Sequence, residues 1–324
     1  MKKVLLLDTS IATFNIGDEI INNSIQNNWP ELFRDNYICK YPVHTPPYAW
    51  WQQLLVSNKF RNLSSVDYKF LCGTNALYTN MVRPLPVWNL YLWNASFCKG
   101  TILLGVGAGI NSKSVNYYTR KLYNNVLSHD FVHSTRDDYT RDMLIRLGFN
   151  AVNTGCPTLW GLTPEHCNLI PRKKSNSVVF TLTSKQPDLE NDKLMIKILE
   201  ESYDHVYFWP QTISDLDYLL SLGDYKYMLV SPNLASYDKI LDKDIDYVGN
   251  RLHGGIRALQ HHKKSIIISI DYRAENMAKS YSLPVIKREK IGQLLKDKIE
   301  DTSETLITGL DWNQINDWKN QFKF

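Results

Sequence analysis

Short runs of apolar residues alternate along the chain with segments whose apolar residues recur at helical spacing. The runs are typical of strands buried on both faces, and the spaced segments are typical of amphipathic helices. Strands are expected at KVLLLD (3–8), YKFLCG (68–73), GTILLGVGAG (100–109), FVHSTRD (131–137), VVFTLT (178–183), HVYFWPQ (205–211), YKYMLV (225–230), DYVGNR (246–251) and SIIISI (265–270).

The helical segments follow these runs. Helices are expected at 15–29, about 115–128, 138–147, 192–203, from 214 onward, 256–262 and within 309–324. Gly148 stands where a glycine commonly ends a helix. Wholly apolar strands that alternate with helices predict an α/β protein, in which helices cover both faces of parallel sheets.

The alternation is interrupted once, by the polar and basic stretch PEHCNLIPRKKSNS (164–177), which we interpret as a linker. The pattern predicts two Rossmann-like parallel-sheet domains facing a cleft, at 1–165 and 175–310, and a C-terminal helix (311–324) that packs back across them. Ligands of such sheets bind at the carboxyl ends of the strands, and between two domains they bind in the cleft.

Composition and charge narrow the class of protein. The 324 residues are 44% hydrophobic and 22% charged, as in globular proteins, and the net charge is +4. Lys and Arg are scattered, interleaved with Asp and Glu, and form no run of five, so we expect no nucleic-acid partner. The mild positive charge suits an anionic substrate and leaves open loose attraction to an acidic membrane surface.

The cysteines and the N-terminus indicate a compartment. None of the five cysteines forms a C-x-x-C pair, which is typical of reduced thiols in a cytosol. The N-terminal apolar run is only Val4–Leu7 and ends at Asp8, so it predicts a first strand, not a signal peptide. We expect a cytoplasmic protein, and peripheral contact with the inner face of the membrane stays open.

Two segments, YPVHTPPYAWW (41–51) and RPLPVWNLYLWNASF (83–97), are rich in aromatic residues and proline. Packing between elements would account for them, as would a platform that stacks on sugar rings. A third interpretation is an interfacial patch that reaches a lipid-linked substrate. Pro84 and Pro86 argue against one regular amphipathic helix in the second segment.

The strongest chemical signal is YVGNRLHGGIRALQHH (247–262). If the strand continues through Arg251 and His253, their side chains share one face. Gly254 and Gly255 would then let a ligand approach a turn, and Arg257 would lie in the first turn of the following helix. Guanidinium groups and helix N–H groups would hold an anion beside an imidazole that delivers a proton. The alternative is an Arg–carboxylate pair with a core histidine.

Two weaker clusters follow other strands. Arg136 closes one strand before Asp137 and Asp138, either of which can cap the next helix. In NIGDEI (15–20), Gly17 allows a tight turn, and Asp18 can cap a helix or accept a proton from a hydroxyl. GVGAGIN (105–111) fails the dinucleotide fingerprint, because Ile110 stands where the third glycine belongs.

Taken in order, NIGDEII, FLCGTNAL, GVGAG, STRDDYTRDML with TGCPTLW, and GNRLHGGIRAL with SIDYR resemble the polysaccharide pyruvyl transferase family, from about Asn15 to Arg273. The resemblance implies a fold like that of two-domain GT-B glycosyltransferases. It also implies transfer of the pyruvyl group of phosphoenolpyruvate onto two hydroxyls of a sugar, in a cell-surface glycan or its lipid-linked precursor, to form a cyclic ketal. Phosphoenolpyruvate is then a co-substrate, and neither a cofactor nor a metal is expected.

The resemblance assigns roles to residues. It implies that Arg251 binds the substrate anion, that His253 transfers the proton and that Arg136, from the other domain, binds phosphate or carboxylate. Asp18 would bind the acceptor hydroxyl or act as base. The remaining expected substrate-binding residues are Leu252, Gly254, Gly255, Arg257, Asn15 and Gly17.

Some points depart from the family or stay open. Family members often have a glycine-rich run after the second strand, and of this run CGTNAL keeps only Gly73. The segment 41–97 matches no motif, so the acceptor sugar cannot be inferred from it. The oligomeric state is also left open by the sequence. One alternative is a GT-B glycosyltransferase with a nucleotide-sugar donor, for which Asp271 could bind the ribose hydroxyls. The other is a non-catalytic assembly scaffold, which the intact Arg251, His253 and Arg136 argue against.

Overall fold

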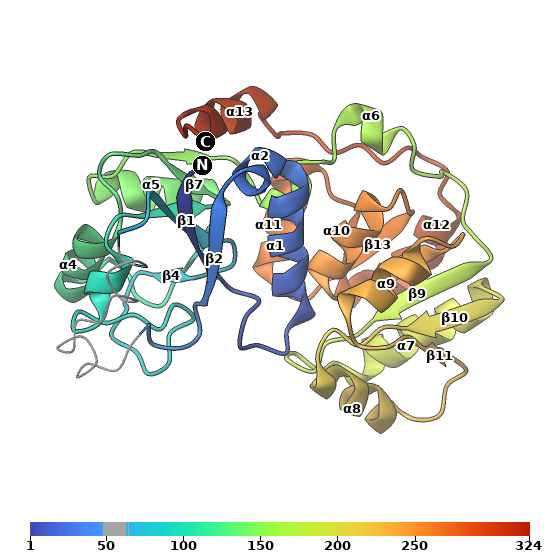
Figure 1. Ribbon diagram of the computed structural model, residues 1–324. Coiled ribbons are helices and arrows are strands. Elements are labelled where there is room, and N and C mark those ends of the chain that lie inside the picture. The colour runs from blue at the N-terminus through green and yellow to red at the C-terminus, as the bar shows by residue number, and fades with distance from the viewer. Residues whose placement is uncertain (48–62, 64) are drawn as a thin grey trace. The chain divides into compact units, whose positions relative to one another are not determined.

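The computed structural model describes residues 1–47, 63 and 65–324, and its contacts divide the chain into two compact units (Figure 1). The first unit comprises residues 1–13, 21–160 and 311–324, and the second comprises 14–20 and 161–310. The division passes through helix α1 (Ile16–Asn28), whose first turn belongs to the second unit. The sequence pattern places residues 14–20 in the N-terminal domain, so the structure groups the NIGD motif differently.

A parallel sheet of order β2-β1-β3-β5 forms the centre of the first unit (Figure 1, blue to teal). Its strands are β1 (Lys3–Asp8), β2 (Tyr37–Pro42), β3 (Tyr68–Cys72) and β5 (Thr101–Leu104). The short pairs are β4 (Leu77–Tyr78) with β6 (Ala108–Gly109) and β7 (His133–Thr135) with β8 (Ala151–Asn153). The helices besides α1 are α2 (Pro30–Arg34), η2 (Ala95–Cys98), α4 (Tyr117–Val126), α5 (Asp138–Arg146), η3 (Pro157–Leu159) and α13 (Trp312–Asn320).

Two hydrophobic layers hold this unit together. One joins the strands to helices α4 and α5 and includes Leu5, Leu71, Leu103, Leu122, Tyr123 and Leu144. The other is aromatic and docks the C-terminal helix α13, with ring centroids 5.3 Å apart for Trp29 and Trp318 and 5.0 Å apart for Phe70 and Phe322. The expected C-terminal helix is therefore present, and it packs within the first unit.

The second unit is built on a six-stranded parallel sheet of order β11-β10-β9-β12-β13-β14. The strands are β9 (Ser177–Thr181), β10 (His205–Phe208), β11 (Met228–Leu229), β12 (Asp246–Gly249), β13 (Ser265–Ser269) and β14 (Val285–Lys287). The helices are α6 (Pro164–Cys167), α7 (Leu189–Ser202), α8 (Ile213–Leu222), α9 (Leu234–Leu241), α10 (Leu252–Gln260), α11 (Tyr272–Tyr281), η4 (Arg288–Lys290) and α12 (Ile291–Glu300). From β9 the strands are added on one side through β10 and β11, and the chain then crosses back to add β12, β13 and β14 on the other side. This reversal between β9 and β12 is a switch point, where a crevice opens at the carboxyl ends of the strands.

Helices cover both faces of this sheet. Phe180, Val248 and Ile266 lie in one hydrophobic cluster with residues of α7, α8 and α12. Tyr247 and Ile267 alternate with these positions along β12 and β13, and helix α10 packs against them. The prediction of an α/β protein with parallel sheets is confirmed. The expected linker contains helix α6, and YKYMLV forms only the two-residue strand β11.

Candidate active site

Arg251 lies at the carboxyl end of β12, where its guanidinium joins three loops of the second unit. Its Nε donates to the carbonyl of Leu182 (3.2 Å) and its Nη2 donates to Thr212 Oγ1 (3.2 Å) and to the carboxylate of Asp215. The loops after β9, β10 and β12 therefore meet at this one side chain, on both sides of the switch point. Its Nη1 makes no hydrogen bond to any residue that the structure describes, so it is available to a ligand.

Asp215 is held as firmly as Arg251. This fully buried carboxylate belongs to a capping box at the start of α8, in which the backbone N–H of Thr212 donates to it over 3.0 Å. The N–H of Ser184 donates to its other oxygen (3.2 Å). The alternative considered for the R-x-H pattern, an Arg–carboxylate pair, is therefore present. It orients the guanidinium and leaves Nη1 uncommitted.

His253 lies two residues further on, in the first turn of α10. Arg251 is the N-cap residue of this helix and provides no side-chain cap, and the first backbone bond within the helix runs from Gly255 N to Arg251 O (3.1 Å). The preceding N–H groups point out of the helix start, which favours an anion there. The interpretation that Arg251 and His253 share one strand face is wrong, because β12 ends at Gly249.

Gly254 and Gly255 do not lie in the turn that the sequence analysis expected. Gly254 and Gly255 are buried inside helix α10, not in a turn before it. A Cβ atom on Gly255 would overlap the side chain of Ile267 and lie 2.9 Å from Tyr247 Cε1. Tyr237 Oη donates to the carbonyl of Gly254 (2.8 Å). The two glycines thus let the helix sit directly on the sheet, which fixes the position of its first turn.

Arg257 lies in the second turn of α10, where the expectation was the first. Its Nε and Nη2 both donate to the carboxylate of Asp238 in α9, each over 2.8 Å. Burial acts to raise the pKa of Asp238, but hydrogen bonds from His261 and Arg257 lower it to about 2. This bidentate ion pair ties α10 to α9 and argues against a substrate-binding role for Arg257.

The NIGD motif binds the loop after β10. Gln211 Nε2 donates to Asn15 Oδ1 (2.9 Å), and the N–H of Ile16 donates to the carbonyl of Gln211 (3.3 Å). A Cβ atom on Gly17 would lie 2.6 Å from Gln211 Nε2, so a larger residue here would force the Gln211 side chain to move. Asn15 Nδ2 donates to the buried carboxylate of Asp18 (2.9 Å). Since Gln211 precedes Thr212, the two motifs meet at one edge of the sheet.

Several buried polar atoms at this edge have no hydrogen-bond partner among the described residues. Each belongs to a residue that ends or follows a strand: Trp209 Nε1, Gln211 Oε1, Asn250 Nδ2 and Oδ1, and Ser269 Oγ. An unpaired buried polar group costs about 1–3 kcal/mol, so several together call for a ligand or ordered water. The sequence analysis missed these residues, and the only available signal was their position directly after apolar runs.

Arg136 lies at the carboxyl end of β7 in the first unit. Its Nη2 donates to Asn75 Oδ1 (2.5 Å) and lies 3.6 Å from the carboxylate of Asp137. A Cβ atom on Gly107 would lie 2.7 Å from Nη2, so this glycine makes room for the guanidinium. Asp137 caps α5 by accepting from Thr140 N (2.8 Å). The sequence analysis expected either Asp137 or Asp138 to cap this helix. The sequence analysis did not identify Asn75.

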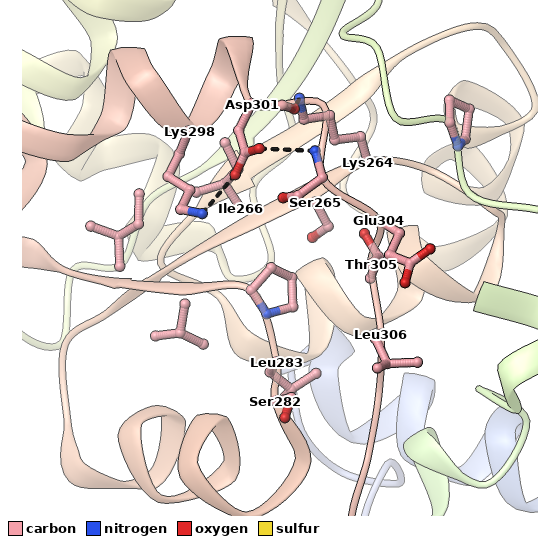
Figure 2. Close-up of a pocket in the computed structure, with 15 residues that line it drawn as sticks. Lys264, Ser265, Ile266, Ser282, Leu283, Lys298, Asp301, Glu304, Thr305 and Leu306 are labelled. Carbon is pink, nitrogen blue, oxygen red and sulfur yellow. Dashed lines mark hydrogen bonds and ion pairs between the residues drawn. The ribbon is translucent and has the colours of Figure 1, made fainter. Parts of the chain in front are cut away.

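A pocket of about 330 Å³ lies at the opposite, amino-terminal edge of the second sheet (Figure 2). Lys264 Nζ donates to the carbonyls of Ile299 (2.7 Å) and Asp301 (2.5 Å), at the end of α12. Lys298 Nζ lies 2.7 Å from the Asp301 carboxylate, and Ser303 N donates to the same carboxylate (2.9 Å). The charged groups of Lys264, Lys298 and Asp301 thus have partners within the protein, so we assign this pocket no site.

Among the described residues, no three His, Cys, Asp or Glu side chains gather in a way that could hold a metal ion. No helix in the described part of the chain is long and apolar enough to cross a membrane.

The fold is that of the GT-B-like sugar-nucleotide enzymes. The structure is similar to the Staphylococcus aureus protein MnaA solved with UDP (TM-score 0.51, 8% identity, 99% of this chain and 96% of that one covered). It is also similar to the Methanocaldococcus jannaschii UDP-GlcNAc 2-epimerase solved with UDP-GlcNAc and UDP (TM-score 0.50, 11% identity, 99% of both chains). At these identities the likeness concerns the fold alone.

The family is defined by sequence. Residues 15–272 match the model of the polysaccharide pyruvyl transferase family, and the chain belongs to this family. No curated protein sequence matches it.

Proposed function

We propose that the protein transfers the pyruvyl group of phosphoenolpyruvate onto two hydroxyls of one sugar residue, in a glycan or its lipid-linked precursor, and so forms a cyclic ketal. The observation that carries the proposal is the arrangement of polar groups at the start of α10. There the Arg251 guanidinium, a helix start whose N-cap side chain makes no capping bond, and an imidazole lie at the switch point of a parallel sheet. The residues belong to the segment that matches the family.

Donor binding follows from charge. Phosphoenolpyruvate carries a phosphate and a carboxylate a few bonds apart, so it needs several donors in a small space. Arg251 Nη1 and the backbone N–H groups of Leu252 and Gly254, in the first turn of α10, supply them. Asp215 keeps the guanidinium in place before the donor arrives, and preorganisation of this kind lowers the entropic cost of binding.

The chemical steps begin with a proton. The His253 imidazolium gives its proton to the methylene carbon of the donor, and an oxocarbenium ion forms at C2. One sugar hydroxyl adds to C2 and loses its proton, and phosphate leaves with the electrons of its bond to C2. The second hydroxyl then adds to C2, loses its proton and closes the ring; of the two hydroxyl protons, one restores the imidazolium and the other leaves with phosphate. The products are the ketal and inorganic phosphate. An anion bound beside the imidazole favours its protonated form.

The acceptor needs a group that takes up a proton. Asp18 lies in the NIGD motif, which contacts the loop that carries Gln211 and Thr212. We assign it to binding or deprotonation of an acceptor hydroxyl, with Asn15 and Gly17 holding it in place. Arg136 is assigned to a phosphate or carboxylate of a substrate, because its guanidinium lies at the carboxyl end of a strand, packed against Gly107.

The second candidate is a glycosyltransferase with a nucleotide-sugar donor. The two similar structures were solved with UDP or UDP-GlcNAc, and a diphosphate could bind at the same helix start. In this case Asp271, at the start of α11, would bind the ribose hydroxyls. Asp271 Oδ1 accepts a long bond from Ala274 N (3.4 Å), which a ribose hydroxyl could replace.

One experiment separates the two. The protein is incubated with phosphoenolpyruvate and a panel of synthetic or lipid-linked glycosides, and phosphate release is measured together with the mass gain of a ketal on the sugar. The proposal is supported if the original protein gives both phosphate release and the mass gain, and if the His253→Ala variant gives neither. A rise in melting temperature with UDP but not with phosphoenolpyruvate, and no ketal, would favour the glycosyltransferase.

A further inference from the structure

One stretch of the first unit is free of acidic residues. The chain holds 37 Lys and Arg and 33 Asp and Glu, which elsewhere are interleaved. Between residues 68 and 129 there is no Asp or Glu, so the expected interleaving is wrong for this stretch. The basic residues within it are Lys69, Arg83, Lys99, Lys113, Arg120 and Lys121, and all except Lys69 reach the surface.

The same stretch exposes large apolar side chains. Their exposed fractions are 60% for Val82, 81% for Leu85, 61% for Trp93, 62% for Ile110 and 80% for Tyr117. Single exposed apolar residues are ordinary on soluble proteins, but several in one region mark a contact surface. Leu85 stands between Pro84 and Pro86 with φ 47°, so its backbone has little freedom to turn the side chain inward.

Hydrogen bonds join these residues into one surface. Asn80 N donates to Asn111 Oδ1 (2.8 Å) and Asn116 Nδ2 donates to Asn80 Oδ1 (2.7 Å), which ties 80–85 to 110–117. Tyr91 Oη donates to the carbonyl of Arg83 (3.4 Å). The rings of Tyr91 and Trp93 stack 4.3 Å apart, and so Trp93 belongs to the same surface. We call residues 82–85, 91–93 and 110–121 the basic–apolar surface.

We propose that the basic–apolar surface binds an anionic lipid bilayer. Exposed Leu, Val, Ile and Trp side chains enter the boundary between headgroups and acyl chains, and Lys and Arg contact lipid phosphates. The absence of Asp and Glu from the residues of the basic–apolar surface decides between partners. A neutral glycan could stack on Trp93 whatever the surrounding charge, whereas an anionic bilayer is repelled by every carboxylate within a Debye length.

The test is co-sedimentation of the full chain with vesicles of phosphatidylcholine alone or with ~30% phosphatidylglycerol. We expect binding to the anionic vesicles only, and a large loss of it in ~0.5 M salt. The double substitution Leu85→Ser with Trp93→Ser should lower the partition coefficient about tenfold or more, because two large apolar groups no longer insert. Lys113→Glu with Lys121→Glu should lower it to a similar extent.

Matched controls remove other exposed apolar side chains, which lie outside the basic–apolar surface. Ile145→Ser in α5 and Leu220→Ser in α8, whose side chains are exposed, should leave vesicle binding within about twofold of the original protein. Melting temperatures of all variants are compared first. If the Leu85 and Trp93 pair lowers the melting temperature, Val82→Ser with Ile110→Ser replaces it.

Three outcomes would overturn the proposal. They are no sedimentation with anionic vesicles, equal binding to neutral and anionic vesicles, and equal losses in the control variants. Retardation in a neutral polysaccharide gel without vesicle binding would show that the surface is a glycan platform instead.

Discussion

The carboxyl ends of the two sheets differ in how their polar groups are paired. In the first unit, Asp8 accepts from Ser10 N (2.8 Å), Thr9 Oγ1 donates to Cys72 O (3.1 Å) and Arg136 has Asn75. In the second unit, Asn250 has no partner among the described residues for either amide atom, and Gln211 lacks one for its oxygen. Asp8 Oδ2 in the first unit also lacks a hydrogen bond, but Lys40 Nζ lies 3.3 Å from it. Among the described residues, more buried polar atoms are left unpaired at the second edge, which is where we propose that the donor binds.

The same contrast holds for two histidines. His133 is buried in the first unit, where its Nδ1 accepts from Leu103 N (3.1 Å) and its Nε2 lies 2.9 Å from the carbonyl of Ser128. Burial lowers its pKa to about 4, so it stays neutral. His253 is half-buried at a helix start in the second unit. Of the two, His253 is the one that we propose exchanges a proton with a substrate.

The largest effect is expected at His253. Removal of a general acid costs typically ~10²–10⁴ in rate, so His253→Ala should lower kcat by that factor with the melting temperature unchanged. His133→Ala should do the reverse, since it leaves a cavity and two unpaired backbone groups in the core. Ketal formation and thermal melting of both variants check this. Full activity of His253→Ala would remove the proposed mechanism.

The two arginines should differ in their effect on stability. Arg251→Ala leaves the carboxylate of Asp215 buried without its cation, which should lower the free energy of unfolding by ~3–5 kcal/mol. Arg136→Ala removes a bond to a neutral amide and a longer contact to a half-exposed aspartate, and should cost ~1 kcal/mol. Urea denaturation measures both.

A control separates folding from binding at Arg251. Arg251→Ala combined with Asp215→Ala should recover much of the lost stability and none of the phosphoenolpyruvate-induced rise in melting temperature. If the double variant still responds to phosphoenolpyruvate, the anion site lies elsewhere.

The units should respond to pH in opposite directions. The pKa of His133 is lowered to about 4, so in the folded state it binds fewer protons than the unfolded chain, and stability falls as pH drops from ~6.5 to 4. Burial raises the pKa of Asp246 in the second unit to about 6, although bonds from Ser175 and Tyr203 oppose this. Its contribution is present below pH ~4 and is lost as pH rises through 6.

Asp246→Asn should therefore reduce the fall in stability of the second unit between pH 4 and 7 by ~1–3 kcal/mol. Hydrogen exchange resolved by unit at several pH values provides the measurement, with the first unit of the same variant as internal control. An unchanged pH profile in the second unit would mean that Asp246 ionises without penalty.

The smallest effect concerns the unpaired amide of Asn250. Asn250→Leu keeps the approximate volume and removes two unsatisfied atoms, so it should raise the free energy of unfolding by ~1–2 kcal/mol and weaken phosphoenolpyruvate binding. In the first unit, Asn94→Leu should destabilise, because the side chain accepts from Tyr91 N (2.7 Å). A loss of stability in Asn250→Leu would indicate that the amide is satisfied by water and has no role in binding.

The local pattern was informative for strands and less so for boundaries. β1, β3, β5, β10, β12 and β13 all lie within predicted runs, and β9 begins one residue before its run. The reason is that a short run of consecutive apolar residues between helices is buried on both faces as a strand. The start of α10 was placed four residues late, since Gly254 and Gly255 have low helix propensity. Packing against Tyr247 and Ile267 overrides that propensity, and it moved Arg257 out of the first turn.

By itself, the sequence determined the α/β class, the family and the position of Arg251 and His253 at a strand–helix junction. Tertiary structure alone decided that Arg251 pairs with Asp215, 36 residues away, and that Asn15 binds Gln211, 196 residues away. The physical reason is that periodicity reports which face of an element is buried, whereas side-chain partners depend on the order of strands in the sheet. That order brings the loops after β9, β10 and β12 together, and no local pattern encodes it.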